Sequence, residues 1–591
     1  MTMGRYPEVE DSPGVLLLST TQMESTLCFL NGILVDSVSK PKVHKMVLGT
    51  RTGIYPDVYP PEFVKEILLF VDEKSIKFVL VSLIEYSLGR ALALMQEIKR
   101  HTSVVIVVGG PYAIEHPEKC IDHGCVDVVN YAHGLYVGEI INFYPDLSNV
   151  PNIYYKNESS IKRTLPKNIG YCMDMLPLPD WSQKDTYIIF NPVWHNLKGG
   201  DAPRLVLVRD SGGALPVEHH QVPHRHTGVL ILSKGCPINT CSFCSISRMY
   251  DKNVDLLSSE TGVSGNHLSK VSWYSADKAI EVVERFLECH PNTEYLLFND
   301  NDFASIPGRV FEQFSEEYIK RVHLPFYCQS SPHLTYARGR QFIARLVEMG
   351  LDTYCMGIET ARQANTLIYS RRGPARIVSE SVQLLNEFVR RDGIHVAYDF
   401  INGNPLETRE QLLETIDLIR SIPLPWNMAL HNLTLDDDIP LSHHIQNMVP
   451  EYRESRGKIT TGGSDYHSAN YSNFKLLRES YLNIVLEWCG GLHDDSNTGR
   501  LKRSLEQFLD QDGIRQIVEQ SDKFRALSEK ALDSGLDTLS FLVSERVYSL
   551  LSGESELIEQ AFELMRPIQY GYHRANRYEY DWGFALRQLS G

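Results

Sequence analysis

Long apolar runs are missing from this sequence of 591 residues, and that absence argues against a membrane protein. A helix that spans a bilayer needs about 20 consecutive apolar residues, and no stretch here reaches that length. The first residues, MTMGRYPEVEDSPGVLLLSTTQ, carry acidic side chains where a secretory signal peptide carries basic ones, and their apolar run is short. We therefore expect a cytoplasmic protein with no membrane partner.

Cysteine and positive charge are also scarce. Eleven cysteines in 591 residues do not suggest the disulfide scaffold of a secreted protein, so the thiols are expected to be reduced. The net charge of −16 argues against a broad phosphate-binding surface, and we expect no nucleic-acid partner. What the chain does contain, 43% hydrophobic and 22% charged residues, is typical of a globular protein with several domains of about 100–200 residues each.

Residues 1–150 alternate short apolar runs with helical patterns. The runs GVLLLS (14–19), IKFVLVSL (76–83) and SVVIVVGG (103–110) are typical of buried parallel strands, and GRALALMQEIKR (89–100) is an amphipathic helix between two of them. This order predicts a doubly wound, Rossmann-like α/β domain.

A second α/β series begins at residue 227. Residues 151–226 are less regular and are expected to form a linker, with a histidine-rich insertion at 210–226 that we interpret as an exposed loop, a metal site being the alternative. Six strand–helix units over 227–445 predict a partial (β/α)6 barrel of the TIM type, in which the chemistry lies at the carboxyl ends of the strands. Residues 446–591 are expected to form a mostly helical region.

Three cysteines lie close together in SKGCPINTCSFCSI, directly after the first strand of the second series. Cys236, Cys241 and Cys244 are spaced for a soft metal, either zinc or an iron–sulfur cluster. A structural zinc site needs four ligands, and the nearby histidines lie at the opposite end of the strand: His219, His220, His224 and His226. An iron–sulfur cluster held by three cysteines leaves one iron open to another ligand.

The sequence ILSKGCPINTCSFCSI resembles the cluster loop of radical S-adenosylmethionine (radical SAM) enzymes, although its spacing is C-x4-C-x2-C where that family usually has C-x3-C-x2-C. Further segments resemble the family in the same order, and together they cover residues 227 to about 440: FNDNDF (298–303), CQSSPHLT (328–335), MGIET (356–360), YSRRGPARIVSESVQLLNE (369–387) and FINGNPLETREQLLETIDLI (400–419). The resemblance implies a 4Fe-4S cluster whose open iron binds S-adenosylmethionine (SAM) and reduces it to a 5′-deoxyadenosyl radical.

The same resemblance suggests residues that bind SAM. Glu359, at a strand end, would hold the amine or the ribose, and a carboxylate at a helix N-terminus is the plainer interpretation. Arg371 and Arg372 would bind the carboxylate, since the guanidinium fork fits it, unless both lie in a solvated loop.

Other polar residues lie at the carboxyl ends of predicted strands, at the same end of the barrel as the cysteine loop. Asn299, Asp300 and Gln329 are expected to contact substrate or cofactor there, and Asn404 is expected to face the adenosine. Cys328 and Cys355 offer further thiols for catalysis, although reduced core cysteines are the plainer interpretation.

Residues 78–134 resemble the cobalamin-binding domain that is fused to many radical SAM enzymes. The expected contacts are Ser82, Gly109, Gly110 and Tyr131. A glycine pair at a strand end lets a flat ligand approach the backbone, and ligands of open α/β sheets settle at that edge. No D-x-H-x-x-G motif occurs between residues 14 and 60, so the cobalt is expected to lack a histidine on its lower face. The alternative is a scaffold that binds no cofactor.

The chain is therefore expected to be a cobalamin-dependent radical SAM enzyme that methylates an unactivated carbon, or a phosphorus, of a small molecule or natural-product precursor. An external low-potential electron donor of the flavodoxin or ferredoxin type would reduce the cluster. Cyclisation, ring rearrangement or oxidation with the same cofactors is one alternative. A zinc-stabilised binding protein without catalysis is another.

Overall fold

The structure is a computed structural model. It describes residues 12–20, 24–35, 37–48, 59–84, 87–131, 134–157, 160–165, 173–182, 185–190, 204–207, 217–218, 227–238, 240–246, 271–371, 375–402, 404–423, 426–433, 439–448 and 579–580. Almost all of the predicted helical region 446–591 and of the histidine-rich loop lies outside these residues.

The chain divides into two compact units. The first is drawn from Met1–Leu215, Ser245–Asn292 and Tyr580–Gly591, and the second from Pro216–Cys244 and Thr293–Glu579. The boundaries that the sequence suggests, 1–150, 151–226, 227–445 and 446–591, stay predictions.

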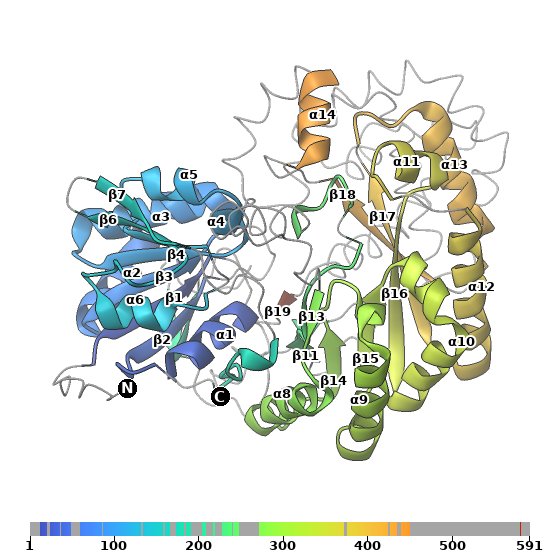
Figure 1. Ribbon diagram of the computed structural model, residues 1–591, viewed down its shortest axis with the longest axis horizontal. Helices are drawn as coiled ribbons and strands as arrows, with labels where there is room; N and C mark the ends of the chain where they lie inside the picture. The colour runs from blue at the N-terminus through green and yellow to red at the C-terminus, as the bar shows by residue number, and fades with distance from the viewer. Residues whose placement is uncertain are drawn as a thin grey trace, which may run out of the picture. The chain divides into compact units, whose positions relative to one another are not determined.

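The first unit is built on a nine-stranded sheet of order β7-β6-β5-β4-β3-β1-β2-β8-β9. Its strands β1 to β5, with β8, run parallel, and the outer strands β6, β7 and β9 pair antiparallel. The bounds are β1 Gly14–Ser19, β2 Lys42–Val47, β3 Ile76–Ser82, β4 Val105–Gly109, β5 Val128–Asn130, β6 Ile153–Asn157, β7 Ser160–Arg163, β8 Thr186–Phe190 and β9 Arg204–Leu207. Figure 1 shows these strands in blue to teal.

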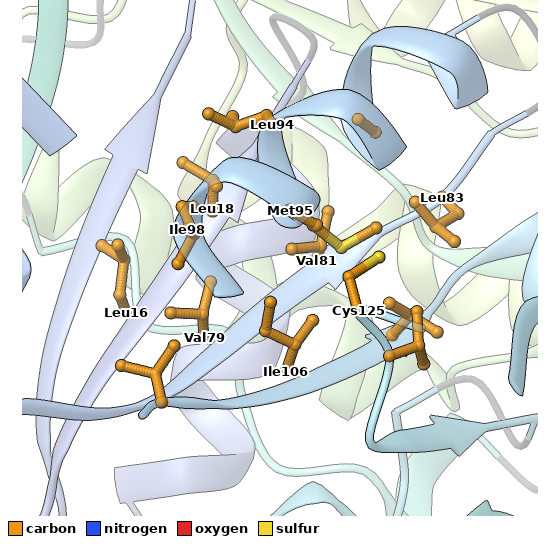
Figure 2. Close-up of a cluster of buried hydrophobic side chains, with 14 of the residues drawn as sticks. Leu16, Leu18, Val79, Val81, Leu83, Leu94, Met95, Ile98, Ile106 and Cys125 are labelled. Atoms are coloured by element: carbon orange, nitrogen blue, oxygen red, sulfur yellow. The ribbon is translucent and has the colours of Figure 1, made fainter. Parts of the chain in front are cut away.

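Helices cover both faces of this sheet, which explains why its central strands are continuous apolar runs. Alternate residues of β1 enter two separate cores: Leu16 and Leu18 pack with α2 and α3, whereas Val15 and Leu17 pack with α1 and α6. Figure 2 shows the first of these cores, with Leu94, Met95 and Ile98 of α3 lying over the strands. The bounds are α1 Glu24–Val35, α2 Pro61–Glu73, α3 Leu88–His101, α4 Pro111–Glu115, α5 Pro117–Asp122 and α6 Val137–Phe143.

The strand order 5-4-3-1-2 places a topological switch point between β1 and β3. The connections leave β1 and β3 on opposite sides of the sheet, and ligands of open α/β sheets bind at the carboxyl ends of such strands. Ser82 ends β3 and Gly109 ends β4, which places both at this edge.

The segment LPLPDWS packs on α1. A Cβ on Gly32 would lie 2.2 Å from the carbonyl oxygen of Leu178, so only glycine allows this approach. The Asn31 amide donates to Asp180 Oδ2 at 2.9 Å, and the ring of Trp181 packs edge-on against Phe286 of α8 (Ala276–Cys289). This part of the predicted linker is therefore ordered structure within the first unit.

The second unit contains a six-stranded parallel sheet in chain order, β11-β14-β15-β16-β17-β18. Its strands are β11 Thr227–Leu230, β14 Tyr295–Phe298, β15 Phe326–Ser330, β16 Leu351–Glu359, β17 His395–Asn402 and β18 Asn427–Asn432. The helices are α9 Gly308–Arg321, α10 Pro332–Met349, α11 Arg362–Leu367, α12 Ala375–Asp392, α13 Arg409–Ser421 and α14 Pro440–Met448. The α/β class with parallel strands that the sequence predicted is confirmed.

Alternation along these strands separates two layers of side chains. Phe298 meets Phe314 and Tyr318 of α9, on the helix-covered face. Tyr295, Leu297, Tyr327, Cys355 and Ala397 form a separate buried cluster, with Val229 packed against it. Because all six strands are parallel, their carboxyl ends share one edge of the sheet.

The remaining short elements are η2 Met173–Met175, β10 Val217–Glu218, β12 Ser233–Gly235, β13 Val271–Trp273, η5 Phe303–Ser305 and β19 Glu579–Tyr580. Within the described part of the chain, every helix is too short or too polar to cross a membrane.

Candidate active site

The cysteine loop follows β11 and is hydrogen-bonded to residues 368 and 369, which follow α11. Ser242, which lies between two of the cysteines, donates its backbone N–H to the Tyr369 carbonyl at 3.0 Å and its hydroxyl to the Ile368 carbonyl at 2.6 Å. Its own carbonyl accepts from the Leu441 N–H at 3.0 Å. The ring of Phe243 packs edge-on against Tyr369, with centroids 5.3 Å apart. These contacts hold the three cysteines beside the segment that carries Arg371.

All three cysteines are partly buried. The pKa of the Cys241 thiol is raised to about 11, chiefly by burial; the Arg371 guanidinium opposes the rise, and Glu359 and Cys236 contribute to it. Cys241 therefore lies within electrostatic reach of Glu359, Arg371 and Cys236. A thiol in such a position becomes a thiolate when a metal supplies the compensating charge.

Across the described ranges, no three His, Cys, Asp or Glu side chains converge on one point as ligands of a single metal ion would. A zinc ion holds its thiolates about 2.3 Å from one centre. In an iron–sulfur cluster each thiolate binds a different iron, so its cysteines are spread over a larger group. The donor set, three thiols on one loop, fits a cluster of this kind.

Glu359 and Arg371 form a buried ion pair beside the cysteine loop. Arg371 Nη1 lies 2.8 Å from Glu359 Oε1, with side-chain exposures of 7% and 16%. Glu359 ends β16 and Arg371 follows α11. The backbone N–H of Arg371 donates to the Asn365 carbonyl at 2.8 Å, which fixes the chain where the arginine leaves it. The structure thus joins two residues that the sequence had suggested separately.

The backbone at Glu359 has a strained conformation. Its φ of +68° lies in the left-handed region, which residues other than glycine seldom adopt and which is frequent at functional sites. A Cβ on Gly357 would lie 2.7 Å from Glu359 Oε1, so a larger residue at 357 would displace this carboxylate from its present position.

A buried polar network supports this segment. The Thr360 hydroxyl donates to Glu407 Oε1 at 3.1 Å and lies 2.7 Å from the Thr415 hydroxyl, which also accepts from the Ala361 N–H at 3.0 Å. Burial raises the pKa of Glu407 to about 8, and the bond from Thr360 opposes the rise. Glu407 is therefore a neutral acid near pH 7.

Replacing Glu407 with Gln is expected to remove a pH dependence of stability. A carboxyl group whose folded pKa, about 8, exceeds its ordinary value of 4.5 stabilises the fold fully below 4.5 and loses that contribution as pH rises through 8. Between pH 5.5 and 7.5 the loss is about 3 kcal/mol at about 1.36 kcal/mol per unit. Denaturant unfolding of wild type and Glu407→Gln at both pH values isolates this group; equal pH dependence in the two proteins would contradict the assignment.

Strand β14 ends at Phe298 and is followed by Asn299 and Asp300. The Asn299 N–H donates to the Leu230 carbonyl at 2.8 Å, and its side chain is partly buried. Asp300 is fully buried, with its Oδ1 turned to residues 232 and 233 rather than to the mouth. Burial raises the pKa of Asp300 to about 7, and hydrogen bonds from those residues oppose the rise. Gln329 is tied to the same turn, because its Nε2 donates to the Asp300 carbonyl at 3.0 Å.

The other suggested residues are placed as follows. Asn404 is 2% exposed, and its Oδ1 accepts from the Leu406 N–H at 2.9 Å. Arg372 lies outside the described residues. Cys328 is fully buried in the sheet, and Cys355 donates its thiol to Asp399 Oδ2 at 3.2 Å.

In the first unit, three suggested residues meet at the sheet edge and one does not. A Cβ on Gly110, whose φ is +89°, would lie 2.4 Å from Ser82 Oγ, so these two residues are in close contact. Among the described residues, a Cβ on Gly109 would meet only the Asn130 carbonyl oxygen, at 3.4 Å. Tyr131 has no exposed surface, and its hydroxyl donates to the Thr164 carbonyl, so its side chain belongs to the core.

Sequence reasoning missed the residues that support the site. Ser242 gave a signal, a polar side chain between two cysteines, that was not used. Asp302 lies in the quoted FNDNDF; its Oδ2 accepts from the Ser331 N–H at 3.1 Å, and burial raises its pKa to about 6, while Ser331, Ser330 and Arg371 oppose the rise. Glu407 carries no sequence signal of burial.

A segment of the chain that includes most of the second sheet is similar to a known protein family. Residues 230–419 match the profile of the Radical SAM superfamily, and this range includes the cysteine loop, Glu359 and Arg371. A curated protein of Pyrococcus horikoshii, named uncharacterized methyltransferase PH0819, is 21% identical over 331 residues. That match covers 55% of this chain and 59% of the relative, so the chain spans less than two thirds of that protein.

Two solved structures share the fold. The radical S-adenosylmethionine methyltransferase TsrM of Kitasatospora setae, solved with its tryptophan substrate and a SAM analog, is 15% identical with a TM-score of 0.51, over 74% of this chain and 76% of that one. The cobalamin-dependent S-adenosylmethionine radical enzyme OxsB, solved with aqua-cobalamin, is 14% identical with a TM-score of 0.52, over 98% of this chain and 81% of that one.

Proposed function

Residues 230–419 form a radical SAM domain, and from that premise we propose that the protein is a cobalamin-dependent radical SAM methyltransferase. The domain binds a 4Fe-4S cluster through Cys236, Cys241 and Cys244. The N-terminal unit binds cobalamin. The substrate is a small molecule, and the transferred methyl group enters an unactivated carbon or a phosphorus centre.

The observation that carries this proposal is the attachment of the cysteine loop to the segment of the buried ion pair. Ser242 is hydrogen-bonded to residues 368 and 369, and Arg371 is paired with Glu359 at 2.8 Å. SAM carries an α-carboxylate and an α-amine on one carbon. A guanidinium binds the first and a carboxylate accepts from the second, so the pair is complementary to this head group. The cluster, when bound, supplies the electron that cleaves SAM.

Several finer assignments belong to the same proposal. The six-stranded sheet curves into a partial (β/α)6 barrel over 227–445, and a Rossmann-like cobalamin-binding domain occupies residues 1–150. Gln329, Asn299 and Asn404 line the SAM site, together with Arg372. An external flavodoxin or ferredoxin delivers the electron in the reducing cytoplasm, and neither nucleic acid nor membrane takes part.

The cobalamin assignment is supported by the residues at the carboxyl ends of two strands of the first sheet. Ser82, Gly109 and Gly110 lie at the carboxyl ends of β3 and β4, beside the switch point, where open α/β sheets bind ligands. Gly109 has no side chain, so among the described residues a flat ring can approach this backbone closely. Cobalamin, when bound, carries the methyl group between SAM and substrate.

Replacing Gly109 with Ala tests the cobalamin site without straining the fold. Its added Cβ meets only an ordinary contact at 3.4 Å, so the melting temperature should stay near that of wild type. Cobalamin affinity should fall at least about tenfold, a cost of about 1.4 kcal/mol, because the methyl group fills the space the ring needs. Equilibrium dialysis with aqua-cobalamin measures this.

Gly110→Ala is the matched comparison. Its Cβ would lie 2.4 Å from Ser82 Oγ and 2.9 Å from Leu83 backbone atoms at a φ of +89°, so this variant should lose stability as well. Unchanged cobalamin affinity in Gly109→Ala would contradict the proposed site.

The function is tested by anaerobic purification with cobalamin supplied, followed by incubation with SAM labelled in its methyl group and a low-potential reductant. We expect a cluster absorption band, bound cobalamin and 5′-deoxyadenosine. A product carrying the label supports methyl transfer. A modified product without the label favours cyclisation, rearrangement or oxidation instead. Zinc without iron or sulfide would overturn the enzymatic proposal in favour of a binding protein.

A further inference from the structure

Asp300 has an unusual environment for an acidic residue at the end of a strand. It has no exposed surface, and one of its two carboxyl oxygens takes three hydrogen bonds. Oδ1 accepts from the Leu232 N–H at 2.9 Å, the Ser233 N–H at 2.6 Å and the Ser233 hydroxyl at 2.6 Å. All three donors belong to the chain that leads into Cys236.

The residues on either side of Asp300 hold the same stretch of chain. The Asn299 N–H donates to the Leu230 carbonyl at 2.8 Å, and Asn301 Nδ2 donates to the Gly235 carbonyl at 2.8 Å. Gly235 directly precedes Cys236 and has a φ of +94°, a conformation that the Asn301 bond helps to fix. Residues 299–301 therefore contact 230–235 through five hydrogen bonds.

The second oxygen of Asp300, Oδ2, is buried and has no hydrogen-bond partner among the residues the structure describes. A buried polar atom without a partner costs stability, and a well-packed apolar side chain would cost less. The residue type is thus explained by its three contacts to the loop rather than by the stability of the sheet.

We propose that residues 299–301 are a clamp that presets the path of the cysteine loop, with Asp300 as its central positioning residue. This inference rests on the proposed cluster. The clamp fixes the chain before Cys236, and the contacts of Ser242 with residues 368 and 369 fix it between Cys241 and Cys244. A loop held at both points keeps its three thiols near the cluster geometry, so that iron is released slowly.

Three variants test the clamp. Asp300→Ala removes the acceptor, Asp300→Asn keeps an amide oxygen for the same three donors, and Asp352→Ala is the matched control. Asp352 stands at the opposite end of a strand of the same sheet, where it accepts from the Tyr295 hydroxyl at 3.1 Å. Each protein is reconstituted anaerobically with iron and sulfide. We then measure the rate of iron loss to EDTA, the EPR spectrum of the reduced cluster with and without SAM, and circular dichroism.

Asp300→Ala should lose iron at least about tenfold faster than wild type, because the outer partners of metal ligands commonly contribute 10–100-fold to metal affinity. Its EPR spectrum should be altered and its circular dichroism unchanged. Asp300→Asn should stay within about twofold of wild type, and Asp352→Ala should match it. The clamp would be overturned if Asp300→Ala lost iron at the wild-type rate and kept the wild-type EPR spectrum. It would also be overturned if Asp300→Asn lost iron as fast as Asp300→Ala.

If Asp300→Ala does not fold, Ser233→Ala and Asn301→Ala test the clamp instead, since each removes one of its hydrogen bonds. Faster iron loss in these variants supports the clamp, and iron loss at the wild-type rate overturns it. The two proposals fail differently. Wild-type protein that takes up no iron and sulfide overturns the proposed function and the clamp together, whereas variants that hold a cluster as firmly as wild type overturn the clamp alone.

Discussion

Replacing Cys241 with Ala should reduce 5′-deoxyadenosine formation more than about 100-fold, to the level of protein without a cluster. Cys241 lies within electrostatic reach of Arg371 and Glu359, so in the proposed site its thiolate would hold the cluster close to the SAM head group. Partners outside the ligand shell of a metal contribute 10–100-fold, and a ligand contributes more. Mass analysis of SAM breakdown under anaerobic conditions measures the product, and iron and sulfide content is determined on the same sample.

Cys289→Ala is the matched control for this prediction. Cys289 is also partly buried, but it ends α8 in the first unit and takes no part in the cysteine loop. The control should keep wild-type iron content and 5′-deoxyadenosine yield. Normal product from Cys241→Ala would show that the cluster assignment is wrong, whatever iron the protein carries.

Removing one charge of the Glu359–Arg371 pair should weaken SAM binding at least about 30-fold, which corresponds to about 2 kcal/mol. Arg371 is buried and Glu359 is largely buried, so each has little water to replace a lost partner. In the proposed site, Glu359→Gln removes the negative charge that faces the amine, and Arg371→Gln removes the guanidinium fork for the carboxylate. Titration calorimetry with SAM on cluster-loaded protein gives the dissociation constants.

The double variant separates binding from stability. Each single variant leaves one buried charge without its partner, a defect that costs about 3–5 kcal/mol of folding stability, and Glu359→Gln with Arg371→Gln removes both charges. We expect the double variant to regain much of the stability and none of the SAM affinity. If affinity returned together with stability, the pair would be a structural ion pair only.

An exposed ion pair between two helices of the second unit serves as the control. Arg340 on α10 pairs with Glu387 on α12, with exposures of 55% and 53%. Arg340→Gln should change stability by no more than about 1 kcal/mol and leave SAM binding unaltered, because solvent screens such pairs.

The sequence by itself determined the local chemistry and the class of fold. Strands that are buried on both faces, such as GVLLLS and SVVIVVGG, have no polar alternation, and this pattern identifies parallel α/β structure without any coordinates. Three closely spaced cysteines after the first strand of a second series also predict a soft-metal loop from spacing alone, because the candidate ligands are neighbours in the chain.

Only the tertiary structure decided which distant residues meet this loop. Glu359 and Arg371 are separated by α11, and their pairing depends on a left-handed backbone at Glu359 and a glycine at 357. Asp300 and Tyr131 show the opposite outcome, since both occupy strand-end positions that suggested ligand contacts. Asp300 turns to the cysteine loop, and Tyr131 enters the core. A one-residue change along a strand reverses the direction of a side chain, and the residues that fill the space beyond it come from elsewhere in the chain.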